Sequence, residues 1–174
     1  MLYLLISTIV LGTAYFLLIL YFLYHWSKIP QADFAPQAFP STPISIIIPA
    51  RNEAANIGAC LQAILSQNYP AQLMEIVVVN DHSEDDTASI VQSITDPRIH
   101  LINLADYPIQ GHAFKKHGIQ TGIRQSRGEL ILCTDADCQM GPEWLPRMVA
   151  FYEQEKSQMI AGPVNFHQEK NLLE

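Results

Sequence analysis

The sequence predicts an α/β domain built on a mainly parallel sheet, preceded by one transmembrane helix. Strand-like and helix-like segments alternate along the chain after residue 43, which is typical of parallel sheets with crossover helices. The strand-like segments are continuous apolar runs, as in strands that are buried on both faces. In contrast, the first 24 residues contain no charged side chain and form a separate apolar segment.

The apolar segment, taken as residues 1–26, is long enough to span a bilayer. A helix of its first 24 residues is roughly 36 Å long, whereas the hydrocarbon core is about 30 Å thick. A cleaved signal peptide is the alternative, but no Lys or Arg precedes the run, which exceeds an h-region of about 7–15 residues. Lys28 follows the helix, so the positive-inside rule predicts a single-pass protein of the cell membrane whose domain is cytoplasmic. The end of the helix carries aromatic residues that suit the membrane interface: Tyr15, Tyr21, Tyr24 and Trp26.

A proline-containing linker, residues 27–43, is predicted between the helix and the domain. Pro49 is expected to end the first strand, and Gly128 to cap a helix at its C-terminus. A capping box of Ser83 and Asp86 is expected to open the second helix. The predicted strands are 44–48, 74–80, 98–103 and 129–134, with 158–164 as a candidate fifth. The predicted helices are 54–67, 83–94, 113–127 and 142–155.

Charge and cysteine content exclude some classes of function. The formal net charge is −7, which disfavours nucleic acid as a partner because a phosphate backbone needs a basic surface. Cys60, Cys133 and Cys138 show no C-x-x-C spacing, so a structural zinc site is disfavoured. We expect all three to be small buried apolar residues with free thiols, which fits a reducing cytoplasm.

Three loops follow the predicted strands and carry acidic residues: 49–53, 80–86 and 134–138. Ligands bind beyond the carboxyl ends of parallel strands, so the chemistry is expected in these loops. Carboxylates that converge at one edge repel each other unless a cation lies among them. A divalent metal ion that holds a diphosphate would meet that need.

Each acidic position also has a plainer interpretation. Asp135 and Asp137 directly follow a strand and offer hard oxygen ligands for Mg²⁺ or Mn²⁺, yet D-x-D pairs also occur by chance in turns and caps. Asp81 ends the second strand, where an acidic residue commonly accepts hydrogen bonds from a ribose or base. Its alternative role is to cap the following helix. Arg51 and Glu53 could simply form an exposed ion pair of little energetic value.

Basic residues and missing motifs narrow the choice further. Lys115 and Lys116 lie at the start of a predicted helix, where positive charge opposes the helix dipole unless a phosphate binds nearby. A solvated helix face is the alternative for either lysine. The first loop contains no G-x-G-x-x-G and the sequence no G-x-x-x-x-G-K-[ST], which disfavours dinucleotide-dependent dehydrogenases and P-loop enzymes.

Taken together, these segments resemble family-two glycosyltransferases over about residues 43–165. The resemblance rests on ISIIIPARNEAANIGACLQAILSQNYP, on EIVVVNDHSEDDT and on FKKHGIQTGIRQSRGELILCTDADC. It implies a GT-A fold and sugar transfer, usually inverting, from a nucleotide-diphosphate sugar. The nucleoside pocket would be lined by Pro49, Ala50, Arg51 and Glu53. Asp81 would contact the base or ribose, Lys115 and Asp135 the nucleotide, and Asp135 and Asp137 the metal.

The sequence departs from the family pattern in two places. Phe114 stands where a glycine usually precedes the lysine, and Lys116 follows it, so either lysine could face the phosphate. Neither the carboxylate base of the acceptor-binding half nor a Gln-x-x-Arg-Trp motif is found, and residues 44–174 resemble a truncated donor-binding domain. We therefore expect donor binding with little transfer by this chain alone, because inverting transfer needs a base.

Three functions are compatible with these observations. The first is a membrane-bound glycosyltransferase that uses a nucleotide-diphosphate sugar, Mg²⁺ or Mn²⁺, and a lipid or polysaccharide acceptor. The second is a catalytically incomplete nucleotide-sugar-binding or scaffold module of a polysaccharide synthesis complex. The third is a phosphotransferase with an Asp nucleophile, which is disfavoured because that class usually carries its D-x-D motif after the first strand.

Overall fold

The computed structural model describes residues 1–28, 40–107 and 114–162, without the side chains of Phe114 and Lys115. The chain divides into two compact units, Met1–Asp33 and Phe34–Glu174. The first unit contains helix α1 (Leu2–Trp26), which has no buried residue. Among the described helices, α1 is long and apolar enough to span a membrane. Most of the predicted linker lies outside the described residues.

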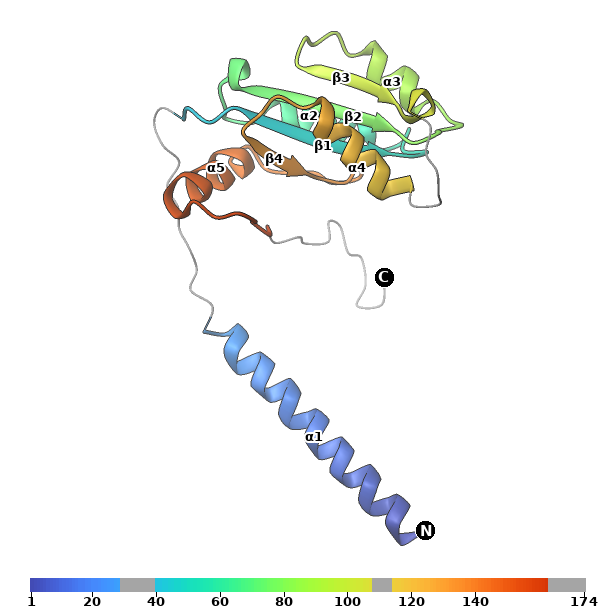
Figure 1. The fold of residues 1–174 in the computed structure, drawn as a ribbon, viewed down its shortest axis with the longest axis vertical. Helices are drawn as coiled ribbons and strands as arrows, with labels where there is room; N and C mark the ends of the chain where they lie inside the picture. The colour runs from blue at the N-terminus through green and yellow to red at the C-terminus, as the bar shows by residue number, and fades with distance from the viewer. Residues whose placement is uncertain (29–39, 108–113, 163–174) are drawn as a thin grey trace. The chain divides into compact units, whose positions relative to one another are not determined.

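The second unit contains a sheet of four parallel strands in the order β3-β2-β1-β4 (Figure 1). The strands are β1 (Ile44–Ala50), β2 (Met74–Asn80), β3 (Ile99–Asn103) and β4 (Leu130–Cys133). The predicted parallel α/β architecture is therefore confirmed, as are the four main strands. The candidate fifth strand is not formed by residues 158–162, and its last two residues lie outside the described part.

The end of β1 differs from the prediction, because the strand continues through Pro49 to Ala50. Pro49 lies opposite Val79 of β2 in the register. The carbonyl of Ile47, two residues earlier, accepts from Thr134 on the β4 side, and Pro49 faces the same side because strand residues alternate. Pairing with β4 ends at Cys133, so the missing N–H of Pro49 leaves no ladder bond unmade.

Helices pack on both faces of the sheet. They are α2 (Ile57–Leu65), α3 (Thr87–Ser93), α4 (Phe114–Gln125) and α5 (Trp144–Glu155), with short 3₁₀ turns at Ala71–Leu73 and Leu104–Asp106. The larger core joins Ile46, Ile48 and Ile76 to α2, α3 and α5. A smaller core on the other face contains Ile47 and Val79, against which α4 packs. This two-sided burial explains why the strands are apolar without alternation.

Two predicted helix caps are wrong, and the structure gives the reason for each. Helix α3 begins at Thr87 without a side-chain cap, because Ser83 is instead bonded to the loop after β1. Helix α4 ends at Gln125, before Gly128. A Cβ on Gly128 would lie 2.4 Å from the backbone nitrogen of Ser45, so the glycine is needed for close backbone approach.

The cysteine prediction holds only in part. All three thiols are free, as expected, but Cys60 alone is fully buried, whereas Cys133 is exposed and Cys138 is half-buried. Cys133 is the last residue of β4, an edge strand, and is paired in register with Ile47. It therefore lies at the rim of the smaller core, where its side chain is exposed.

Candidate functional site

The three predicted loops lie at one edge of the sheet, because the strands that lead into them are parallel and adjacent (Figure 1). The three strands end at Ala50, Asn80 and Cys133, and each loop follows directly. The amide of Asp81 donates to the carbonyl of Ala50 (2.8 Å), and the amide of Thr134 donates to Ile47 (3.2 Å). Backbone bonds therefore continue from the sheet into the loops and place all three side by side.

The loop after β1 supplies most of the predicted nucleoside pocket. Pro49 and Glu53 are half-buried, Arg51 is exposed, and Ala50 is buried. Because the carbonyl of Ala50 already accepts from Asp81, Ala50 would act through the shape of the pocket. The plainer interpretation, an Arg51–Glu53 ion pair, is not borne out among the described residues. Glu53 Oε2 instead accepts from the side chain of Asn56 (3.0 Å).

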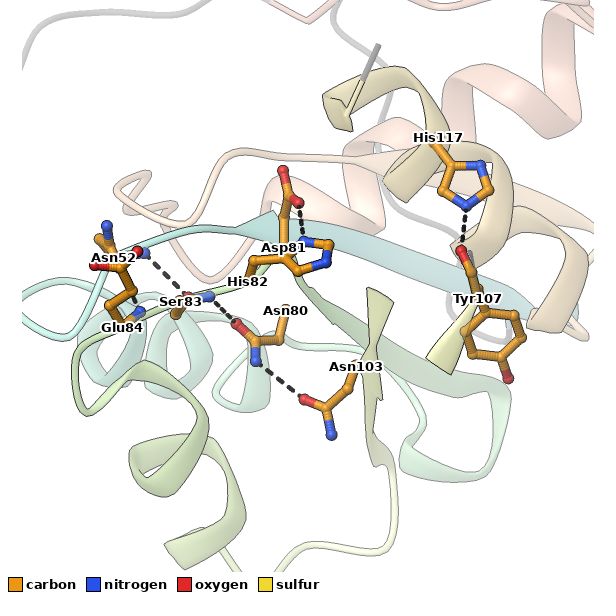
Figure 2. A network of polar contacts seen from close by, with 9 residues as sticks. All are labelled: Asn52, Asn80, Asp81, His82, Ser83, Glu84, Asn103, Tyr107 and His117. Atoms are coloured by element: carbon orange, nitrogen blue, oxygen red, sulfur yellow. Dashed lines mark hydrogen bonds and ion pairs between the residues drawn. The ribbon is translucent and has the colours of Figure 1, made fainter. Parts of the chain in front are cut away.

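The loops after β1 and β2 are interlocked through Asn52, as Figure 2 shows. The Asn52 amide donates to Oγ of Ser83 (3.1 Å), and Oδ1 of Asn52 accepts from the Glu84 amide (2.8 Å). Asn52 has φ of 55°, the left-handed region that Asn tolerates better than most residues. An Asn at this position therefore accepts the turn and bonds the neighbouring loop.

A second pair of bonds joins the same loops closer to the core. The amide of Glu53 donates to Oγ1 of Thr87 (2.8 Å), and the amide of Ala54 donates to Oδ2 of Asp85 (3.0 Å). Asp85 Oδ1 also accepts from the hydroxyl and the amide of Thr87. These bonds, led by that of the Thr87 hydroxyl, lower the pKa of Asp85. The carboxylate thus bridges the first loop and the start of α3.

Asp81, the predicted ribose or base ligand, is almost buried and bonded to its neighbour. Its Oδ1 lies 2.9 Å from Nδ1 of His82, and the two side chains are 11% and 46% exposed. His82 has φ of 55°. On the other side of the strand end, Asn80 donates to Asn103 (3.0 Å) and accepts from the Ser83 amide (3.1 Å), as Figure 2 shows. The residues on both sides of His82 are therefore fixed.

The D-x-D loop after β4 presents two carboxylates around a buried residue. Asp135 and Asp137 are exposed, whereas Ala136 is buried. The carbonyl of Asp135 accepts from the amide of Cys138 (3.3 Å) and from Sγ of Cys60 (3.7 Å). Burial raises the pKa of Cys60 to about 12, so this thiol remains a neutral donor. The loop is thus attached to α2 through its backbone, and its carboxylates remain at the surface.

The donor set of the D-x-D loop fits a hard divalent cation. Carboxylate oxygens are the ligands that Mg²⁺ and similar ions prefer, with water or substrate phosphate completing the shell. Among the described residues, no group of three or more His, Cys, Asp or Glu side chains is placed to hold an ion. Asp135 and Asp137 could therefore contribute only part of a coordination shell, and a diphosphate would supply further oxygens.

The predicted phosphate ligand lies on helix α4 and not in one of the three loops. Lys115 is in the first turn of α4, but its side chain is outside the described residues, whereas Lys116 is exposed. At the next residue after Lys116, Nε2 of His117 lies 3.0 Å from the carbonyl of Tyr107 (Figure 2). This contact ties α4 to the segment after β3, and the choice between the two lysines stays open.

A cavity of about 680 Å³ lies elsewhere, at the amino ends of the strands. Its walls include Ile44, Met74 and Gly128 together with Asp96 and Arg98. Arg98 donates two hydrogen bonds to Asp96, and this contact lowers the pKa of Asp96 to about 2. None of the three acidic loops lines this cavity. Ligands of parallel sheets bind at the carboxyl ends of the strands, so the three loops stay the predicted site.

Several polar residues of this edge were not identified from the sequence. Asn52, His82, Thr87 and the pair Asn80–Asn103 hold the loops. All but Asn103 lie in segments that carry the family resemblance, but no role was predicted for any of them. One signal was available: two neighbouring strands both end in Asn, and adjacent parallel strands bring such ends together. Sequence reasoning did not find the positive φ of His82, which lies between the fixed amides of Asp81 and Ser83.

Comparisons with known proteins agree with this architecture. The profile described as Glycosyl transferase family 2 matches residues 45–173. Glycosyltransferase AglE of Haloferax volcanii is 35% identical over 123 residues, which are 71% of this chain and 40% of that protein. The undecaprenyl-phosphate 4-deoxy-4-formamido-L-arabinose transferase of Shewanella sediminis is 30% identical over 133 residues, 75% of this chain and 38% of that protein. The chain therefore spans about two fifths of the length of these curated relatives.

Solved structures show the same fold. The mannosyltransferase PcManGT from Pyrobaculum calidifontis, in complex with GDP-Man and Mn²⁺, superposes with a TM-score of 0.61 at 29% identity, covering 75% of this chain and 39% of that chain. S. aureus TarS 1-349 in complex with UDP-GlcNAc gives 0.57 at 24% identity, over 72% and 38% of the two chains, which is a likeness of fold alone. The predicted GT-A class is confirmed, and the profile match over most of the sequence shows that this chain belongs to glycosyl transferase family 2.

Proposed function

We propose that this chain binds a nucleotide-diphosphate sugar and forms the donor-binding part of a metal-dependent, inverting glycosyltransferase at a membrane. The observation that carries the proposal is the arrangement of the loops at the carboxyl ends of the strands, which we call the carboxyl edge of the sheet. Interlocked loops after β1 and β2 lie beside a loop with two exposed carboxylates. One part suits a nucleoside and the other suits a metal-bound diphosphate.

The nucleoside would bind where the loops after β1 and β2 meet. Pro49, Ala50, Arg51 and Glu53 would line the pocket. Asp81 would accept hydrogen bonds from the ribose or base, because an ionised carboxylate is only an acceptor. Its side chain is 11% exposed, so a bound nucleoside would find an oriented carboxylate at little cost in side-chain entropy.

The diphosphate would bind between the D-x-D loop and the start of α4. Asp135 and Asp137 would hold Mg²⁺ or Mn²⁺, which neutralises charge on the leaving diphosphate. Lys115 would add a positive charge from the first turn of α4. The GDP-Man and Mn²⁺ in the PcManGT complex support this choice of ligand and ion, since that protein shares the fold at 29% identity.

In the proposed reaction, an acceptor hydroxyl attacks the anomeric carbon as the bond to the diphosphate oxygen breaks. The configuration at the anomeric carbon is inverted, the nucleoside diphosphate leaves, and a base takes the hydroxyl proton. None of the residues assigned above is placed for that last role. Helix α1 would keep the domain near a lipid or polysaccharide acceptor, with the domain in the cytoplasm, and the undecaprenyl-phosphate transferases among the relatives support a lipid acceptor.

A second function is a nucleotide-sugar-binding module without turnover of its own, in a polysaccharide synthesis complex. The residues assigned above would bind the donor and its metal, and none of them is placed to act as the base, which favours this candidate. Incubation of the chain with a donor sugar and a lipid acceptor would separate the two functions. Efficient transfer by this chain alone would exclude the module.

Calorimetric titration of the full chain in detergent with UDP and GDP, with and without Mn²⁺, tests the proposal. We expect one nucleotide to bind in a Mn²⁺-dependent manner, and Asp137→Ala to weaken that binding at least about 100-fold, because it removes a metal ligand. Glu155→Ala, an exposed carboxylate at the end of α5, is the matched control and should bind normally. Failure of the folded chain to bind either nucleotide would contradict the proposal.

A further inference from the structure

We propose that His82 is a positioning residue for the nucleoside, which holds the carboxylate of Asp81 in the orientation that accepts the ribose or base. This inference rests on the proposed function, because it concerns how the assigned ligand Asp81 is prepared. The observation that carries it is the contact between Nδ1 of His82 and Oδ1 of Asp81 at 2.9 Å (Figure 2).

The contact has a defined direction. An ionised carboxylate has no proton to donate, so Nδ1 of His82 carries the hydrogen and donates it to Asp81. A hydrogen bond to a charged acceptor is stronger than one between neutral groups. The carboxylate lies at the boundary of the protein, 11% exposed, whereas the imidazole is 46% exposed. The more exposed imidazole ring of His82 therefore holds the less exposed carboxylate of Asp81 in place.

The backbone around His82 is arranged for this contact. On one side, the amide of Asp81 is fixed to Ala50, and on the other the amide of Ser83 is fixed to Asn80. Between these two anchors His82 has φ of 55°, where a side chain with a Cβ is disfavoured relative to glycine. If a compact turn were the whole role of this position, glycine would serve better. The histidine keeps an unfavourable conformation and places its ring on Asp81.

The test is titration of the full chain with whichever nucleoside diphosphate the wild type binds, together with thermal unfolding. His82→Gly keeps the turn and removes the donor. We expect its affinity to fall about 10-fold, which is the usual size of a lost hydrogen bond to a charged group, with no fall in melting temperature. His82→Asn tolerates the same φ and carries an amide donor near the place of Nδ1, so we expect binding close to that of the wild type.

The positioning role also predicts coupling to Asp81. In an Asp81→Asn background, His82→Gly should cost no further affinity, because the carboxylate that His82 orients is gone. Lys156→Gly is the matched control for backbone relief, since Lys156 has φ of 52° at the end of α5, far along the chain from the site. It should leave nucleotide binding unchanged.

Several results would overturn the inference while leaving the proposed function intact. They are equal nucleotide affinity of wild type and His82→Gly, an equal loss in His82→Asn and His82→Gly, or fully additive losses with Asp81→Asn. A wild-type chain that binds no nucleotide would instead contradict the proposed function itself. The change in affinity on adding Mn²⁺ should be the same in wild type and His82→Gly, because His82 acts on the nucleoside and not on the metal.

Discussion

The two parts of the carboxyl edge are built in different ways. The loops after β1 and β2 are joined by side chains that bond the backbone of the opposite loop, mainly Asn52, Asp85 and Thr87. The loop after β4 is attached through backbone carbonyls instead, and Asp137 extends to the surface. The nucleoside side, made of the loops after β1 and β2, is therefore shaped by folding, whereas the metal side, the loop after β4, presents two exposed carboxylates.

The largest expected effect is a loss of nucleotide binding without a loss of stability, on the metal side. Asp137→Ala should lose nucleotide binding at least about 100-fold and yet keep its melting temperature within about 2 °C, because substitutions of exposed residues rarely exceed ±0.5 kcal/mol. Thermal unfolding followed by circular dichroism, beside titration, measures both. A fall in melting temperature of more than about 5 °C would show that Asp137 also supports the fold.

On the nucleoside side, stability and binding should fall together. Thr87→Val keeps the shape of a fully buried side chain but removes the hydroxyl that accepts from Glu53 and donates to Asp85. A buried amide left unpaired costs about 1–3 kcal/mol, so we expect the melting temperature to fall by about 4–8 °C with weaker nucleotide binding. Thr95→Val, at an exposed position, is the control. Unchanged stability of Thr87→Val would contradict the interlocked-loop account.

Acid should loosen the nucleoside side through Asp85. Its pKa is lowered in the folded chain from the ordinary value of 3.8, chiefly by the Thr87 hydroxyl. A lowered pKa stabilises the fold fully above the ordinary value, and that contribution is lost as pH falls through the folded value. The stability difference between wild type and Asp85→Asn should therefore be present at pH 7 and shrink below about pH 4. Thr95→Val, which changes an exposed residue and no ionisable group, should show no such trend, and an unchanged difference in acid would contradict the assignment.

The smallest effect concerns the thiols around the D-x-D loop. Cys60 is fully buried with a pKa of about 12, whereas Cys138 is half-buried. Thiolates are the reactive species, so iodoacetamide at pH 8 should label Cys138 at least about 10-fold faster than Cys60 in the folded chain. Peptide mass spectrometry at early times measures this ratio. Equal rates would mean that the loop separates from α2 often.

Much of the fold was predictable because one sequence signal, the pattern of apolar residues, indicates most of its strands and helices. Continuous apolar runs predicted the four strands that form. The acidic residues after three of these strands led to the prediction that the site lies at their carboxyl ends. The ends of the strands and helices were less predictable, because they depend on which segments lie beside them in the folded chain. Pro49 remains in β1 only because β4 has already ended beside it, a fact that no local pattern contains.

The ligand residues of the candidate site stay predictions, and the residues that support its loops were not predicted. Asp81, Asp135 and Asp137 belong to recognisable positions after strands. Asn52, by contrast, bonds across loops, and such contacts follow from the tertiary arrangement. His82 bonds its neighbour Asp81 from a residue with positive φ, a conformation that no local sequence pattern indicates. The role of Gly128 was also misjudged, because its tight approach to Ser45 joins segments 83 residues apart in the sequence.

The most direct measurement is a crystal structure of the chain with Mn²⁺ and the bound nucleoside diphosphate, with the ion located by its anomalous scattering. Our account predicts a single Mn²⁺ peak within bonding distance of an Asp137 oxygen and a nucleoside whose ribose or base lies against Asp81. Nucleotide in the cavity lined by Met74, Asp96 and Arg98, or Mn²⁺ away from the D-x-D loop, would contradict the assignment of the donor site to the carboxyl edge of the sheet.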